Sequence, residues 1–174
     1  MSKIAFVFPG QGSQYVGMCK AFYDQYPVAR QLFEEADDAL GFSLTKLCFE
    51  GPEAELRLTY NTQPAILTAS TICAEILKQH GAVADIAAGH SLGEYSALVN
   101  AGAMKFADAV RIVRQRGQFM QEAVPVGEGS MSAVMGLANE TIVELCQKVE
   151  AETGLPVQAV NFNCPGQVVI AGAT

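Results

Sequence analysis

This sequence lacks paired cysteines, an excess of basic residues and long hydrophobic runs. Its five cysteines form no Cys-x-x-Cys pair, so we interpret them as reduced thiols of a cytoplasmic protein and expect no metal site. Acidic residues outnumber basic residues by 18 to 11, giving a net charge of −7, which argues against nucleic acid or an anionic membrane as a partner. The apolar run 4–8 is too short for a signal peptide, and no run approaches the roughly 20 residues of a membrane span.

Charged residues are also scarce, at 17% of the chain, whereas 50% of the residues are hydrophobic. This composition is typical of a compact globular protein and excludes a disordered one. A length of 174 residues is enough for one domain with a real core, or for one domain and part of another.

Residues 1–126 show the alternation of strands and helices that is typical of an α/β fold with a parallel sheet. The run 4–8 predicts a strand buried on both faces, and the apolar segment that ends at Ala88 predicts a second strand. One helix is expected from about Met18, and a second begins with Pro27 as its first residue. Further helices are expected over 62–79, from Glu94 onward, and over 106–122. Segment 41–61 is expected to be irregular, apart from a short helical piece at 53–58.

The helix over 62–79 is expected to open at Thr62 and to be well buried, because its apolar residues surround most of its circumference. His80 and Gly81 are expected to end it, with the glycine in the C′ position.

The pattern changes after Pro125. Residues 127–129 predict a hinge, and a strand over 131–137, a helix over 140–152 with Asn139 as its N-cap, and strands over 157–162 and 167–171 follow. This β-α-β-β order is the first part of a ferredoxin-like split βαβ unit. We therefore expect two parts, 1–126 and 127–174.

The stretch around Ser91 carries the clearest chemical signal. Gly89 and Gly93 flank the serine in a Gly-x-Ser-x-Gly motif, between the second predicted strand and a helix-favouring segment. Such a sharp turn lifts the serine hydroxyl above the end of the strand, and a side chain at either glycine would clash with neighbouring backbone. The pattern indicates a nucleophilic serine for acyl transfer. The alternative is an ordinary Gly-rich loop between a strand and a helix.

A nucleophilic serine needs oxyanion donors and a base. The backbone N–H of Leu92, at the start of a helix, is one candidate donor, and that of Gln11, in the Gly-rich loop after the first strand, is the other. Of the two histidines, we expect His90 to point away from the serine hydroxyl and to hold the turn, and His80 to be a solvated helix end. Neither is a convincing base.

Arg116 lies at the edge of the apolar stripe of the helix over 106–122. At about 100° per residue it is roughly 40–60° from Val113 and Met120, whereas Arg111 points well away from the stripe. We therefore expect Arg116 to be partly buried and to need an anionic partner. An internal ion pair and a bidentate clamp for a substrate carboxylate both stay open.

Five motifs resemble, in order, those of the malonyl-CoA:acyl carrier protein transacylases of bacterial fatty acid synthesis. They are GQGSQ at 10–14, YNTQPA at 60–65, GHSLGE at 89–94, RGQFM at 116–120, and NFN at 161–163 together with GQV at 166–168. The resemblance covers essentially the whole chain and implies an α/β-hydrolase-like subdomain followed by the start of a ferredoxin-like small subdomain. The family's catalytic histidine lies beyond the equivalent of Thr174, so the chain resembles the N-terminal part of the enzyme.

The resemblance also implies the site residues: Ser91 as nucleophile, Gln11 and Leu92 as oxyanion donors, Arg116 as the carboxylate-binding residue, and Gln63 as a lining residue. His90, next to the serine, is a further candidate lining residue. The implied reaction moves malonyl from malonyl-CoA to the phosphopantetheine thiol of acyl carrier protein through a malonyl-serine ester. It needs no metal or other cofactor, because CoA is part of the substrate. The implied partners are malonyl-CoA, acyl carrier protein and a missing C-terminal segment of the same enzyme. The alternatives are a serine esterase or thioesterase, and an incomplete fragment that only binds CoA or carrier protein.

Overall fold

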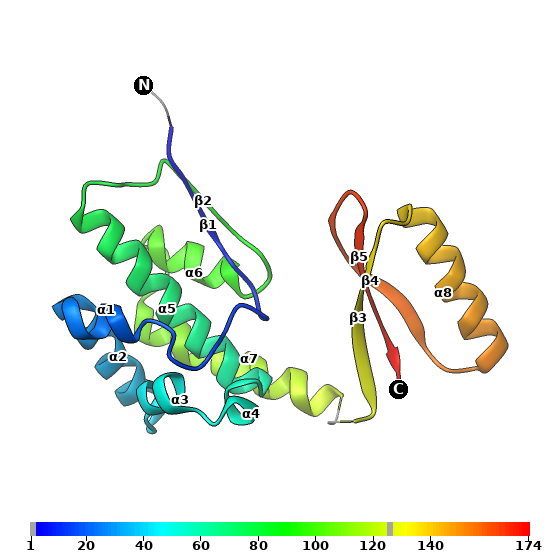
Figure 1. The fold of residues 1–174 in the computed structure, drawn as a ribbon, viewed down its shortest axis with the longest axis horizontal. Helices are drawn as coiled ribbons and strands as arrows, with labels where there is room; N and C mark the ends of the chain where they lie inside the picture. The colour runs from blue at the N-terminus through cyan, green and yellow to red at the C-terminus, as the bar shows by residue number, and fades with distance from the viewer. Residues whose placement is uncertain (1–2, 125–126) are drawn as a thin grey trace. The chain divides into compact units, whose positions relative to one another are not determined.

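The computed structural model describes residues 3–124 and 127–174 (Figure 1). The chain has a mixed α/β fold and divides into two compact units, Met1–Gln121 and Glu122–Thr174. The first unit contains a small parallel sheet, and the second contains a small antiparallel sheet. The division expected from the sequence places its boundary after Val126, which lies outside the described residues.

In the first unit, strands β1 (Ala5–Phe8) and β2 (Ile86–Gly89) pair in parallel, with Phe8 opposite Gly89. The helices between them are α1 (Lys20–Gln25), α2 (Pro27–Leu40), α3 (Leu44–Glu50), α4 (Glu53–Leu56) and α5 (Thr59–Gln79). Strand β2 leads into α6 (Gly93–Asn100), and α7 (Phe106–Ala123) follows. Because the two strands are parallel, the loops that follow them leave the sheet at the same edge.

The prediction that the first strand is buried on both faces is wrong for the described residues. Phe6 and Phe8 are buried and pack with Ala74 of α5 and Ala97 of α6. Val7 is 76% exposed, because alternate side chains of a strand point to opposite faces and the described helices cover only one of them. A continuous apolar run identifies a strand but not what covers each of its faces.

Segment 41–61, expected to be largely irregular, contains the helix α3. The hydroxyl oxygen of Ser43 accepts a hydrogen bond of 3.1 Å from the N–H of Lys46, which makes Ser43 the N-cap. Leu44 and Cys48 are fully buried one turn apart. The cap followed by apolar residues at helical spacing is a signal that sequence reasoning missed. The short helical piece expected at 53–58 is α4, Glu53–Leu56.

Helix α5 begins at Thr59, not at Thr62, so Pro64 lies inside the helix. The helix ends as expected: the N–H groups of Gly81 and Ala82 donate back to carbonyls of its last turn, at 3.0 Å each, and Gly81 has a φ of 86°. The expected burial is correct for most of its length, but Leu77 is 46% exposed.

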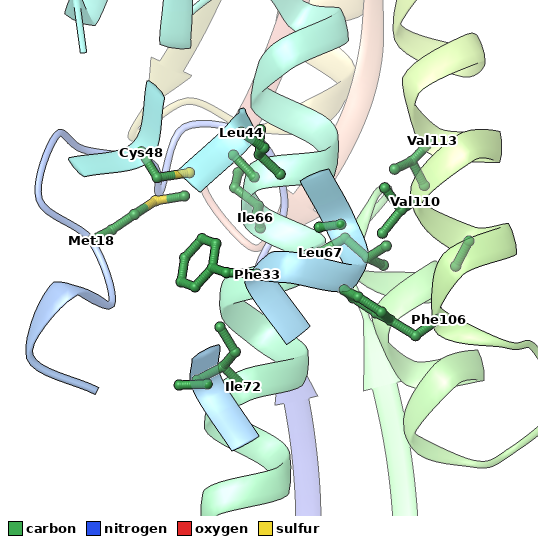
Figure 2. Close-up of a cluster of buried hydrophobic side chains, with 14 of the residues drawn as sticks. Met18, Phe33, Leu44, Cys48, Ile66, Leu67, Ile72, Phe106, Val110 and Val113 are labelled. Atoms are coloured by element: carbon green, nitrogen blue, oxygen red, sulfur yellow. The ribbon is translucent and has the colours of Figure 1, made fainter. Parts of the chain in front are cut away.

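The main core of the first unit lies where α2, α3, α5 and α7 meet. Figure 2 shows Phe33, Leu44, Leu67 and Val110, one from each of these helices, among the side chains of this buried cluster. Pro27 is the first residue of α2, as predicted, and Phe33 belongs to the buried face of that helix. This core fixes α5 and α7, which carry the polar residues described below.

The second unit is a three-stranded antiparallel sheet with the order β3-β5-β4, built from β3 (Gly129–Met135), β4 (Val157–Cys164) and β5 (Gln167–Ala173). Helix α8 (Asn139–Thr153) packs Ile142 and Cys146 against Val168 of β5. The predicted β-α-β-β order is therefore correct. The N-cap of α8 is Ala138 rather than Asn139, which corrects the sequence prediction by one residue.

Candidate active site

Ser91 lies at a sharp turn between β2, which ends at Gly89, and α6, which begins at Gly93. Its side chain is exposed, and its backbone has a φ of 50°, in the left-handed region that non-glycine residues rarely adopt. This is the strand, strained turn and helix that the motif predicted. The strain at a serine that faces solvent is an observation that favours a functional role.

The two glycines are needed because backbone fills the space around them. A Cβ on Gly89 would lie 1.9 Å from the carbonyl carbon of Gly93, and one on Gly93 would lie 2.3 Å from the carbonyl oxygen of Phe8. Neither neighbour is a flexible side chain, so the backbone itself would have to move. The motif therefore encodes a close approach of α6 to the ends of both strands.

Arg116 extends from α7 to the hydroxyl of Ser91. Its Nη2 donates to Oγ of Ser91 at 3.0 Å, and its Nη1 donates to Oε1 of Gln63 at 2.7 Å. The guanidinium also lies 5.8 Å from the ring centroid of Tyr95. The structure thus brings together three residues that are far apart in the sequence, Gln63, Ser91 and Arg116.

Arg116 is half-buried, as its helical position predicted. Within residues 3–124 and 127–174, none of the ion pairs involves Arg116, whereas Arg111 of the same helix pairs with Asp108 at 3.2 Å. The internal ion pair that was one interpretation of Arg116 is therefore absent from the described part of the chain. Its charge is held by neutral oxygens, which leaves it able to attract an anion.

Gln63 is fully buried on α5 and uses both ends of its amide. Its Oε1 accepts from Arg116, and its Nε2 lies 3.3 Å from Sδ of Met120. Because a guanidinium has only donors, the first contact requires the amide oxygen to face Arg116, and the amide nitrogen then faces the weakly accepting sulfur. Met120, expected in the apolar stripe of α7, is instead 45% exposed.

The N–H groups of Gln11 and Leu92 belong to the loops that leave β1 and β2 at one edge of the sheet. In the part of the chain that the structure describes, neither N–H donates a hydrogen bond to a protein acceptor. The side chain of Gln11 is tied back, since its Nε2 donates to Oγ1 of Thr59 at 3.1 Å. Neither N–H is therefore committed to a protein acceptor in the described residues.

The two histidines lie at opposite ends of β2. The N–H of His90 donates to the carbonyl of Phe8 at 3.1 Å, and its imidazole lies against Gly10, where a Cβ would be 2.8 Å from Nδ1. His80 caps the end of α5 before β2 begins, and its Nε2 lies 3.4 Å from the hydroxyl of Tyr26. His80 is thus separated from Ser91 by the length of the strand.

Sequence reasoning did not single out Thr59 and Tyr95. Tyr95 lies in the first turn of α6, and because Ser91 precedes that helix in a left-handed conformation, helical spacing from Ser91 could not place this ring beside Arg116. Thr59 belongs to the segment that was expected to be irregular, so nothing in the sequence connected it with Gln11.

A cavity of about 470 Å³ is lined by residues of β1, α1 and α5, and Ser91, Gln63 and Arg116 are not among them. Cys19 and Cys73 both line it. The hydrogen bond between these thiols lowers the pKa of Cys73 to about 7, although burial opposes this change, and it raises the pKa of Cys19. The cysteines are free thiols, in agreement with the sequence prediction.

In residues 3–124 and 127–174, no three His, Cys, Asp or Glu side chains are grouped in a way that could hold a metal ion. None of the described helices combines the length and the apolar character that a membrane span requires.

Comparison with known proteins assigns the chain to a family. It belongs to the acyl transferase domain family, whose model matches residues 5–174. It is 57% identical over 172 residues to the malonyl CoA-acyl carrier protein transacylase of Bacillus subtilis (strain 168), covering 99% of this chain and 54% of that relative. It is 54% identical over 173 residues to the protein of the same name from Escherichia coli (strain K12), covering 99% of this chain and 55% of the relative.

Solved structures give the same relationship. The acyl-carrier-protein S-malonyltransferase of Burkholderia pseudomallei 1710b matches with a TM-score of 0.91 and 53% identity, over 99% of this chain and 56% of that one. A type II PKS acyl-carrier protein in complex with its malonyl-transacylase matches with a TM-score of 0.93 and 50% identity, again over 99% and 56%. The chain spans about half the length of the relatives it matches.

Proposed function

We propose that the protein that carries this chain transfers malonyl from malonyl-CoA to the phosphopantetheine thiol of acyl carrier protein. The names of the relatives support this reaction, and one observation carries it for this chain. A guanidinium without an acidic partner in the described residues donates to the hydroxyl of an exposed serine on a strained turn. A cation at that place suits an acyl group that ends in a carboxylate.

In the proposed reaction, Ser91 gives its hydroxyl proton to the proposed base, which later returns it to the departing CoA thiolate, and Oγ attacks the thioester carbonyl of malonyl-CoA to form a tetrahedral intermediate. The N–H groups of Gln11 and Leu92 donate to its oxyanion. The intermediate collapses with loss of the CoA thiolate, which takes up a proton, and malonyl remains as an ester on Ser91. The thiol of the carrier protein then loses its proton and attacks the ester carbonyl. The serine oxygen leaves and takes up that proton, which restores the hydroxyl of Ser91.

Arg116 is proposed to bind the malonyl carboxylate, and Gln63 to hold it in place. The guanidinium has five N–H donors in a planar fork, and the hydrogen bonds to Gln63 and Ser91 use one donor on Nη1 and one on Nη2. A malonyl carboxylate is two carbons from the carbonyl that Ser91 attacks, so one cation beside Oγ can reach it. His90 is proposed to line the site through its place beside Gly10.

The base and the finer fold are part of the same proposal. The resemblance implies that a histidine from the part of the family's sequence that this chain does not span acts on Ser91. The parallel strands and the elbow support an α/β-hydrolase-like first unit, and the β3-α8-β4-β5 order supports the start of a ferredoxin-like second unit. Cytoplasmic location is supported by the free thiols. No metal or cofactor other than CoA as a substrate takes part in the proposed reaction.

A serine esterase or thioesterase is the second candidate from the sequence. It would pass the acyl group to water and would gain nothing from a cation beside the nucleophile. The two functions differ in the fate of the acyl-serine ester, which either waits for a thiol or is hydrolysed. The Arg116–Ser91 hydrogen bond favours transfer of a charged acyl group.

The test uses the complete protein and malonyl-CoA, with mass spectrometry of proteolytic peptides. A malonyl ester should appear on the peptide that contains Ser91, should be absent in Ser91→Ala, and should leave faster on addition of carrier protein than in buffer. A label on Cys19 or another thiol would contradict the nucleophile, and hydrolysis that outpaces transfer would favour the esterase.

A further inference from the structure

The beginning of α5 contains a backbone carbonyl without its helical partner. In an α-helix, the carbonyl of each residue accepts from the N–H four residues later. The partner of the Tyr60 carbonyl would be the N–H of residue 64, but Pro64 has none. Because a carbonyl in a partly buried place needs a donor, either water or another part of the protein has to supply one.

Arg114 of α7 supplies this donor. Its Nη1 donates to the carbonyl oxygen of Tyr60 at 3.0 Å and also to Oδ1 of Asn61. Its guanidinium lies over two rings, 4.8 Å from the centroid of Phe42 and 4.6 Å from that of Tyr60. Burial lowers the pKa of this guanidinium, and none of the ion pairs in the described residues includes it.

The residues that receive Arg114 are themselves held in place. Asn61 is 5% exposed, and its Nδ2 donates to the carbonyl of Glu55 at 2.8 Å. Its amide therefore has one possible orientation, with Oδ1 facing Arg114. The contact joins α7 to the segment before α5 as well as to α5 itself.

A second contact brings the backbones of α5 and α7 together. Gly117 of α7 lies against the first turn of α5, where a Cβ would be 2.4 Å from Cα of Tyr60 and 2.8 Å from the carbonyl oxygen of Thr59. Gly117 thus sets how close the two helices are. Arg114, one turn earlier, sets how they are aligned, because its donors fit one carbonyl and one amide.

The candidate site has residues on both of these helices, next to their contact. Gln63 immediately precedes Pro64 on α5, and Arg116 immediately precedes Gly117 on α7; they share a hydrogen bond of 2.7 Å. From there Arg116 reaches Oγ of Ser91 at 3.0 Å. A displacement of α7 along α5 would carry the guanidinium away from both partners.

We propose that Arg114 is a positioning residue that anchors α7 to the beginning of α5 and so places Arg116 beside Ser91 for a carboxylated acyl group. This inference rests on the proposed function, in which Arg116 binds the malonyl carboxylate. Arg114 touches none of the reacting atoms. It acts through the Tyr60 carbonyl and Asn61, and its loss affects the discrimination between charged and uncharged acyl groups.

The experiment compares kcat/KM for loading Ser91 from malonyl-CoA and from acetyl-CoA in the complete enzyme. Arg114→Gln should lower the malonyl-to-acetyl ratio by about tenfold to a hundredfold, the effect expected when a binding group moves by about 1 Å. Arg114→Lys keeps a cation between the rings but loses the planar fork of donors. Its malonyl-to-acetyl ratio should lie between that of the unsubstituted enzyme and that of Arg114→Gln. Arg111→Gln is the matched control on the same helix, because Arg111 is exposed and its one ion pair in the described residues is with Asp108, and its ratio should not change.

Gly117→Ala tests the same inference by a different route. It should push the helices apart and lower the ratio in the same direction, and circular dichroism would establish that each variant is folded. A ratio unchanged in Arg114→Gln, or equal losses for both substrates, would show that Arg114 only stabilises the fold. If Arg114→Gln does not fold, the ratios of Arg114→Lys and Gly117→Ala decide. Failure of the unsubstituted enzyme to load malonyl on Ser91 would remove the proposed function itself and would be seen before any substitution.

Discussion

The elbow around Ser91 and the contact between α5 and α7 both shape the candidate site, but they are held by different means. The elbow is set by backbone crowding within a few consecutive residues, with Gly89 and Gly93 against neighbouring main chain. The helix contact is set by side chains from distant segments, above all Arg114 on the Tyr60 carbonyl. The turn that carries Ser91, the proposed nucleophile, is therefore encoded locally, whereas the place of Arg116, the proposed carboxylate-binding residue, depends on long-range packing.

The largest expected effect is a slower loading of Ser91 when the elbow is present without the proposed base. The 174-residue chain, prepared alone, should load malonyl on Ser91 about 10²–10⁴-fold more slowly than the complete enzyme, because a positioned base contributes that much. His90 lies against Gly10, and His80 is at the far end of β2, so neither is expected to replace it. Loading by the chain alone is measured by intact mass, and the remaining half of a relative is then added. A rate equal to that of the complete enzyme would make one of these histidines the base.

Gly93→Ala should break the elbow directly. The new Cβ would lie 2.3 Å from the carbonyl oxygen of Phe8, and overpacking of this kind costs about 3 kcal/mol. Urea unfolding of the variant and of Ser91→Ala, which removes the hydroxyl without adding bulk, measures the difference. A loss below about 1 kcal/mol in Gly93→Ala would mean that the elbow adjusts more easily than its packing indicates.

Cys73 offers a test of a long-range contact outside the site. Because the hydrogen bond with Cys19 lowers the pKa of the Cys73 thiol to about 7, its thiolate, the reactive form, should predominate above that pH and disappear below it. Alkylation by iodoacetamide, followed by peptide mass spectrometry, should reach half its maximal rate near pH 7. It should slow about tenfold for each further unit of acidification, since the thiolate fraction then falls in proportion.

Two other cysteines provide controls for the predicted alkylation of Cys73. Cys19→Ala removes the hydrogen bond and should move the midpoint of Cys73 alkylation to higher pH. Cys48, whose pKa burial raises to about 12, should remain unlabelled in the folded protein. A midpoint of Cys73 that is the same with and without Cys19 would show that the two thiols do not interact.

The smallest expected effect is on the free energy of unfolding, when the starts of α3 and α8 are compared by matched substitutions. Ser43→Ala removes the N-cap hydrogen bond of α3 and should cost about 1 kcal/mol of unfolding free energy. Asn139→Ala should change it by less than about 0.5 kcal/mol, because Asn139 makes no cap hydrogen bond in α8. Denaturant unfolding of both variants gives the comparison, and a larger loss at Asn139 would reverse the assignment of the caps.

Much of the elbow could be predicted from the sequence because its physics is local. An apolar run, two glycines around a serine and a helix-favouring segment define the turn, and Ser91 and Leu92 follow from it. The helical position of Arg116 similarly predicted its partial burial, since the phase of a helix depends only on residue spacing.

The remaining features depend on contacts that spacing does not contain. The exposure of Val7 depends on what covers β1, and the early start of α5 depends on a donor from α7 for the carbonyl that Pro64 leaves unpaired. The sequence could not decide whether Arg116 forms an internal ion pair or binds a substrate carboxylate, because only the fold brings Gln63 and Ser91 to it. The short cap signal at Ser43 was readable but was missed.

The central claim is that Arg116 beside Ser91 selects an acyl group that carries a carboxylate. Its most direct test is the rate of Ser91 loading from malonyl-CoA and from acetyl-CoA in Arg116→Ala of the complete enzyme. Malonyl loading should fall about a hundredfold or more, because a desolvated carboxylate that loses its partner costs about 2–5 kcal/mol. Acetyl loading should change little or even rise. Equal losses for the two substrates would contradict the claim and would make Arg116 a residue that serves the fold alone.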